Sequence, residues 1–290
     1  MPEIIQPTIY PRVSSLEIAR YVATSPHLKS NFATAIQILD SNVNESDFPD
    51  ITDNCLRLKI DDIISDNTKS VENGYYKGRT KDSLVVATEE NLIKPIVEFA
   101  KKQFDAIVPN DFADKYHSDM SPENKTVMLI GISEKISELI QRTYVHCYAG
   151  KSRSTATSLI YTAEIRRLFC NLLWKCHINL DDVRGYSNNG TVHGLFANNI
   201  GAVPNTLFIQ LYDAFLWRNE LSSNENFFES AIFFKLNQIW DTTNIVRYAL
   251  IRKSLNFDTS CLNLESLMSP TENTSPTTQQ MNFQFTYTEK

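Results

Sequence analysis

The fold of this chain is decided by the stretch Thr143-Tyr144-Val145-His146-Cys147-Tyr148-Ala149-Gly150-Lys151-Ser152-Arg153-Ser154. Its first four residues have the pattern of a short strand, and apolar side chains then recur at helical spacing from Ser154 to about Cys170. A loop between a strand and a helix N-terminus directs several backbone N–H groups at one point, where the helix dipole adds roughly half a positive charge. The sequence therefore predicts an anion-binding loop at residues 147–153.

Two reactive side chains, Cys147 and Arg153, stand at the ends of this loop. With this spacing we expect the sulfur to lie under a bound phosphate, whose equatorial oxygens the guanidinium binds in a bidentate manner. The positive surroundings favour the thiolate, which is the nucleophilic form of cysteine. Gly150 suits a position that needs positive φ or a close backbone approach, and the Ser154 hydroxyl can donate a hydrogen bond to the thiolate.

In these details the loop resembles the signature of the cysteine-dependent phosphatases, and among them most closely the dual-specificity phosphatases. Upstream, Leu58-Lys59-Ile60-Asp61-Asp62 is similar to that family's strand that ends in the general-acid loop. The resemblance places the general acid on Asp62, with Asp61 as the alternative. Downstream, Ile200-Gly201-Ala202-Val203-Pro204-Asn205 resembles the family's Pro-Asn turn before its last core helix. Together the matched segments span about residues 4–218.

The resemblance implies a two-step reaction without metal or other cofactor. Cys147 attacks phosphorus while Asp62 protonates the leaving oxygen, and water then hydrolyses the phosphocysteine with Asp62 as the base. Ser154 helps the sulfur to leave in the second step. His146 is expected to order the loop by hydrogen bonding. The residues expected to bind the substrate phosphate are Tyr148, Ala149, Gly150, Lys151, Ser152 and Arg153.

The substrate expected from the resemblance is a phosphorylated protein, with phosphotyrosine first and phosphoserine or phosphothreonine second. A phosphoinositide or other phospholipid is the nearest alternative, because Ala149-Gly150-Lys151 resembles loops of lipid phosphatases in the same superfamily. Those loops often carry a second basic residue where this chain has Tyr148. RNA triphosphatase activity is a less favoured alternative, because the chain lacks a basic surface for nucleic acid. A module that binds phosphorylated partners without turnover is the alternative from another functional class.

The remaining patterns predict an α/β fold in which helices flank a central, mostly parallel sheet, as in the dual-specificity phosphatases. The expected strands cover residues 4–10, 33–39, 55–60 and 143–146. The expected helices cover residues 16–22, 91–108, 127–140, 154–170, 206–218 and 226–255.

The domain organisation expected from these patterns is one catalytic domain at residues 1–220, followed by a helical extension at 221–258. The last segment, 259–290, has the composition of a disordered tail. The catalytic domain is longer than a minimal member of the family. The extra material is expected as insertions near residues 66–90, 109–125 and 177–199.

Charge and cysteine content limit the partners and the compartment. The net charge is −6, and the chain has no run of Lys and Arg that would form a nucleic-acid-binding surface. The five cysteines are odd in number and lack metal-ligand spacing, which favours a reducing, intracellular compartment such as the cytoplasm. No stretch of about 18 apolar residues predicts a transmembrane helix.

Overall fold

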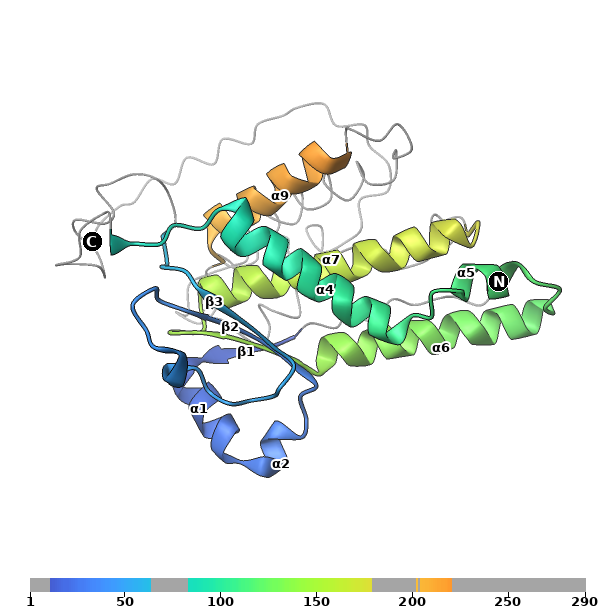
Figure 1. The fold of residues 1–290 in the computed structure, drawn as a ribbon. Coiled ribbons are helices and arrows are strands. Elements are labelled where there is room, and N and C mark those ends of the chain that lie inside the picture. The colour runs from blue at the N-terminus through green and yellow to red at the C-terminus, as the bar shows by residue number, and fades with distance from the viewer. Residues whose placement is uncertain (1–10, 64–82, 179–201, 203, 221–290) are drawn as a thin grey trace, which may run out of the picture.

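The computed structural model describes residues 11–63, 83–178, 202 and 204–220 (Figure 1). Its strands form one four-stranded sheet in the order β1-β4-β2-β3, and every neighbouring pair is parallel. The α/β class and the parallel sheet predicted from the sequence are therefore confirmed for the described residues. The strands are β1 (Arg12–Ser15), β2 (Thr34–Leu39), β3 (Cys55–Lys59) and β4 (Thr143–Cys147).

The two inner strands, β2 and β4, are buried along their whole length. This is usual for parallel strands that helices cover on both faces. Ser15 pairs with Cys147 at the end of β1 and β4, and Leu39 pairs with Lys59 at the end of β2 and β3. The residues that follow all four strands therefore meet at one edge of the sheet, where ligands bind in open α/β sheets.

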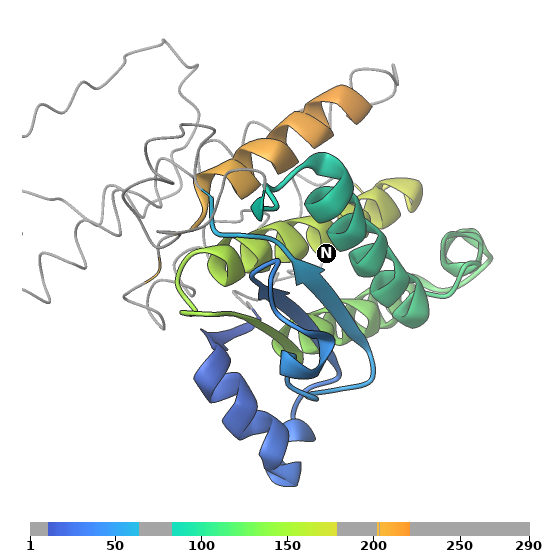
Figure 2. The same ribbon diagram turned by 60° about the vertical axis from the view of Figure 1, so that its left-hand side comes forward.

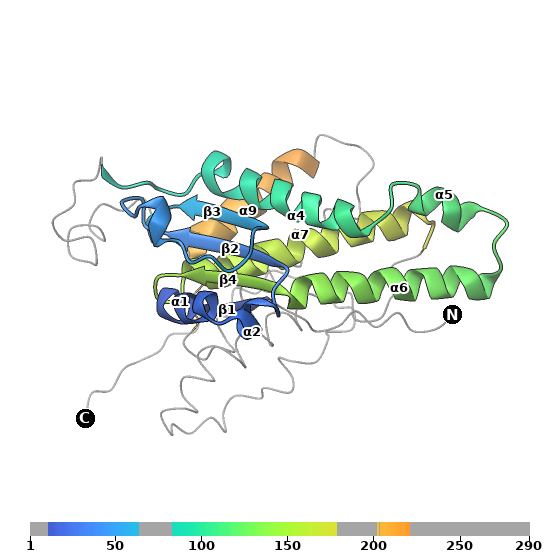
Figure 3. The ribbon, with the colours of Figure 1, turned by 60° about the horizontal axis from the view of Figure 1, so that its bottom comes forward.

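Helices cover both faces of this sheet (Figures 1 and 3). One face carries α1 (Leu16–Thr24) and α2 (Pro26–Lys29). The longer helices lie on the other face, and α9 packs there against α7 and η3 (Figure 2). These elements are η3 (Glu89–Ile93), α4 (Lys94–Ile107), α5 (Phe112–His117), α6 (Pro122–Gln141), α7 (Arg153–Lys175) and α9 (Thr206–Glu220). A short 3-10 turn, η1 (Glu45–Asp47), precedes β3.

Alternation along the strands divides the core into two main parts. Val145 faces the long helices and belongs to the larger cluster, which includes buried residues of α4, α6, α7 and α9. Its neighbour Tyr144 faces the other way and packs with Ala19 and Val22 of α1. Each fully buried side chain the size of valine or leucine stabilises the fold by about 1.5–3 kcal/mol. Because the larger cluster holds more such side chains, it contributes most of the hydrophobic stabilisation.

The structure corrects several predicted boundaries. β1 was not predicted, and the strand that was predicted at residues 4–10 lies outside the described residues. The segment 109–125, which was predicted as a polar insertion, contains α5 and the first turn of α6. The N-cap of α6 explains its early start, because the Ser121 side chain accepts a hydrogen bond from the Asn124 N–H.

Other predicted segments cannot be compared with the structure in full. Most of the insertions predicted near 66–90 and 177–199 lie outside the described residues, and so do the extension at 221–258 and the tail at 259–290. The helices predicted at 16–22, 127–140, 154–170 and 206–218 are present, each longer than predicted. The helix predicted at 91–108 is also present, as η3 followed by α4.

Candidate active site

The loop between β4 and α7 is shaped by the backbone of the neighbouring β1–α1 junction. Gly150 has a φ of 71°, in the region that favours glycine. A Cβ atom on Gly150 would lie 2.5 Å from the carbonyl carbon of Ser14 and 2.6 Å from the backbone nitrogen of Ser15. The Leu16 N–H also donates a 3.1 Å hydrogen bond to the Tyr148 carbonyl. Only glycine fits where the two segments meet this closely.

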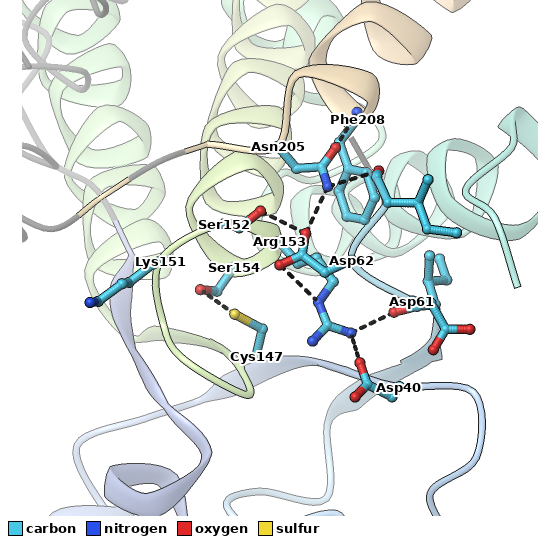
Figure 4. A network of polar contacts seen from close by, with 12 residues as sticks. Asp40, Asp61, Asp62, Cys147, Lys151, Ser152, Arg153, Ser154, Asn205 and Phe208 are labelled. Carbon is cyan, nitrogen blue, oxygen red and sulfur yellow. Dashed lines mark hydrogen bonds and ion pairs between the residues drawn. The ribbon is translucent and has the colours of Figure 1, made fainter. Parts of the chain in front are cut away.

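Cys147 ends β4 and lies beside the first turn of α7. Its Sγ is 3.1 Å from the Oγ of Ser154, and both residues are buried (Figure 4). The predicted pairing of these two side chains is therefore present. The sulfur lies at the N-terminus of α7, which is the positive end of the helix dipole.

Arg153 is the first residue of α7, and its side chain is 3% exposed. Its Nη1 donates hydrogen bonds to Asp40 Oδ1 at 2.7 Å and to the Ile60 carbonyl at 2.6 Å. Its Nε lies 3.9 Å from Asp62 Oδ2 (Figure 4). The guanidinium is thus held by residues that follow β2 and β3. Sequence reasoning missed Asp40, although its position directly after a strand at this sheet edge was a usable signal.

Asp62, the predicted general acid, lies beside the loop. Its Oδ1 accepts hydrogen bonds from Ser152 Oγ at 2.6 Å and from Asn205 Nδ2 at 2.8 Å. Asn205 also donates to the Ile63 carbonyl at 3.1 Å, and its Oδ1 accepts from the Phe208 N–H in the first turn of α9. The Pro-Asn turn noted in the sequence therefore holds the segment that carries Asp62, a role that its sequence pattern did not reveal.

Asp61, the alternative acid, is turned away from the loop (Figure 4). It is completely buried, and its carboxylate accepts hydrogen bonds from Ser41 and Val85. Asp62, by contrast, contacts Ser152 and Arg153 of the loop. The geometry therefore favours Asp62 for any acid–base step at Cys147.

The other predicted loop residues differ in exposure. Tyr148 is 52% exposed, and Ala149 and Lys151 are exposed as well. The Lys151 side chain points away from Arg153 (Figure 4). These three side chains are therefore exposed, whereas those of Cys147 and Arg153 are buried.

His146 lies on the opposite face of β4 from Cys147 and is fully buried. Burial lowers the pKa of His146 to about 4, against a smaller effect of the Cys147 backbone, which raises it. Neither ring nitrogen makes a full hydrogen bond within the described part of the chain. The role expected of His146, ordering the loop by hydrogen bonding, stays a prediction, and its buried side chain lies on the side of β4 that faces away from Cys147.

No protein-family model, curated protein or solved structure matches this chain. Among residues 11–63, 83–178 and 202–220, as far as they are described, no cluster of three or more His, Cys, Asp or Glu side chains is arranged to hold a metal ion. The helices in this part of the chain also lack the combination of length and apolar character that crossing a membrane requires.

Proposed function

We propose that this chain hydrolyses phosphate monoesters through a phosphocysteine at Cys147. The observation that carries the proposal is the 3.1 Å contact between Cys147 Sγ and Ser154 Oγ, at a helix N-terminus that also presents Arg153. A thiolate nucleophile needs an anion site around it and a group that stabilises it when it leaves. The α7 N-terminus and Arg153 meet the first need, and the Ser154 hydroxyl meets the second.

The first step forms a bond from Cys147 Sγ to phosphorus and breaks the bond from phosphorus to the ester oxygen. Asp62 donates its proton to that oxygen, which leaves as an alcohol. In the second step a water oxygen attacks phosphorus while Asp62 takes up the water proton. The S–P bond breaks, inorganic phosphate is released, and the Ser154 hydroxyl donates a hydrogen bond to the departing thiolate.

Arg153 places the anion site next to Asp62. One guanidinium already pairs with Asp40 at 2.7 Å and lies 3.9 Å from the Asp62 carboxylate. A phosphate group bound at Arg153 would therefore lie next to Asp62, within reach of the residue to which we assign the acid–base steps.

A phosphorylated protein, with phosphotyrosine first, is the substrate class that we propose. Tyr148 is 52% exposed at the surface of the site, where an aromatic side chain can pack against the substrate ring. A phosphoinositide remains the second candidate, because the exposed Lys151 adds one positive charge beside the loop. The net charge of −6 opposes binding to an anionic membrane.

The proposal is tested by turnover of an aryl phosphate, a phosphotyrosine peptide and a soluble phosphoinositide without added metal. Cys147→Ser is expected to abolish turnover, and Asp62→Asn to reduce it by about 10² to 10⁴. Faster turnover of the phosphotyrosine peptide would favour a protein substrate, and faster turnover of the phosphoinositide would favour a lipid substrate.

Two matched variants control for the loss of any thiol or any carboxylate. Cys55→Ser removes a thiol whose pKa burial raises to about 11, and Asp53→Asn removes an exposed carboxylate. Both are expected to retain wild-type turnover. Absence of turnover in the wild type, or turnover that does not depend on Cys147, overturns the hydrolase proposal and favours a phosphate-binding module.

A further inference from the structure

Asp61 links two segments that are far apart in the sequence. Its Oδ1 accepts the Ser41 N–H at 3.2 Å, and its Oδ2 accepts the Ser41 hydroxyl at 2.7 Å and the Val85 N–H at 2.7 Å. The Asp61 N–H in turn donates to the Val85 carbonyl at 3.0 Å. A completely buried carboxylate is thus satisfied by three donors, as a buried charge requires.

The residues next to these contacts are the ones that hold Arg153. Ser41 follows Asp40, which accepts from Arg153 Nη1 at 2.7 Å. Asp61 follows Ile60, whose carbonyl accepts from the same Nη1 at 2.6 Å. The Asp61 carboxylate therefore joins the chain after β2 to the chain after β3, and each of these segments supplies one acceptor for the guanidinium.

We propose that Asp61 is a positioning residue of the anion site, which fixes the direction of the Arg153 guanidinium by holding the ends of β2 and β3 together through Ser41. Asp61 itself neither touches the substrate nor transfers a proton. The inference rests on the proposed function only in that the loop binds a phosphate group. Binding of inorganic phosphate therefore tests it independently of turnover.

Asp61→Asn is the first variant, because it keeps the size of the side chain and replaces one acceptor oxygen by an NH2 group. That group then faces backbone or hydroxyl donors. We expect the full-length Asp61→Asn protein to bind inorganic phosphate about tenfold more weakly by titration calorimetry, since a bidentate guanidinium contact depends on direction. Asp53→Asn, the exposed control, should bind phosphate as the wild type does.

A double-mutant comparison separates positioning from a general effect on the fold. If Asp61 acts through Arg153, Asp61→Asn should weaken phosphate binding little further in the Arg153→Lys background, where the bidentate contact is already lost. An equal loss in both backgrounds overturns the proposal. Ser41→Ala removes one donor and keeps the carboxylate, so it should show a smaller loss of the same kind and serves if Asp61→Asn does not fold.

Turnover of aryl phosphates with a series of leaving groups distinguishes Asp61 from a general acid. Asp61→Asn should lower kcat/KM by a similar factor for all leaving groups, whereas Asp62→Asn should affect the poor leaving groups most. A loss confined to poor leaving groups in Asp61→Asn would make it the acid and overturn the proposal. If the wild type binds phosphate without hydrolysing any ester, the hydrolase proposal fails while the positioning role stands. If it binds no phosphate, both fail.

Discussion

Two segments meet at the anion site, and they are held in different ways. The loop at residues 147–153 is fixed by main-chain contacts, because Gly150 lies against the backbone of the β1–α1 junction. The segment at residues 60–63 also has main-chain hydrogen bonds at Ile60 and Asp61, but the Asp62 carboxylate itself is held by the side chains of Ser152 and Asn205. The candidate nucleophile is therefore placed by the sheet itself, whereas the candidate acid is placed by a sum of separate hydrogen bonds.

This difference has an energetic consequence. A single side-chain hydrogen bond contributes about 1 kcal/mol net, so one substitution near Asp62 shifts the acid without unfolding the protein. A side chain at position 150 would overlap the neighbouring backbone, so the backbone of β1, β4 or the loop would have to move to accommodate it. Substitutions in the two segments should therefore differ in size and in kind.

The largest effect is expected from Gly150→Ala. The new Cβ meets the backbone of Ser14 at 2.5 Å and also forces a residue with a side chain into positive φ. Misplacing the loop by about 1 Å is enough to lower kcat/KM by roughly a hundredfold, and the overlap should destabilise the fold by ~3 kcal/mol. Aryl phosphate turnover and chemical denaturation measure the two effects.

Gly131→Ala is the matched control for Gly150→Ala. Gly131 lies within α6, and a Cβ there would have no atom within 4 Å. The control should leave turnover unchanged and stabilise the helix by about 0.5–1 kcal/mol. Similar behaviour of the two variants would contradict the idea that main-chain packing shapes the loop.

A smaller effect is expected from Asn205→Ala, which removes two hydrogen bonds to the segment of Asp62 and the side-chain cap of α9. We expect kcat to fall about tenfold for poor leaving groups, because the acid is less well placed, while phosphate affinity stays the same. Steady-state kinetics and phosphate titration test this. Gln210→Ala, at an exposed position of the same helix, is the control. A loss of phosphate affinity in Asn205→Ala would show that Asn205 supports the loop itself.

The last effect concerns His146 and is measured on stability alone, because it is absent at neutral pH and appears only as the pH falls. Because the pKa of His146 is lowered to about 4 in the folded chain, the unfolded chain binds more protons between pH 6.5 and pH 4. Stability is therefore complete above about pH 6.5 and falls with decreasing pH, by roughly 3 kcal/mol at pH 4. Denaturation at several pH values should show a shallower loss for His146→Gln, and the usual loss for the exposed control His27→Gln. Identical slopes for all three proteins would disprove the effect.

Much of the fold could be predicted from local patterns. Periodicity predicted β2, β3, β4 and the long helices, because each carries a regular set of apolar side chains. β1 was not predicted because Arg12-Val13-Ser14-Ser15 has only one apolar residue. Its strand conformation depends on pairing with β4, in which Arg12 pairs with Tyr144, 132 positions later in the sequence. The early start of α6 was not predicted because it depends on the Ser121 N-cap and not on an apolar pattern.

The candidate site divides in the same way. Cys147, Arg153 and Ser154 lie within one short loop and helix turn, so their spacing predicted their grouping. The pairing of Arg153 with Asp40 joins residues 113 positions apart, and that of Asn205 with Asp62 joins residues 143 positions apart. Such contacts follow from the strand order β1-β4-β2-β3, which no local pattern in the sequence encodes.

The main-chain support of the loop also bears on how such a site changes over evolution. Tyr148, Ala149 and Lys151 are exposed, and the backbone contacts that shape the loop do not depend on the identity of their side chains. Mutations at these three positions can accumulate by drift without disturbing the sulfur or the guanidinium below them. A library randomised at the three positions would therefore sample new ligand preferences while Cys147 and Arg153 keep their places.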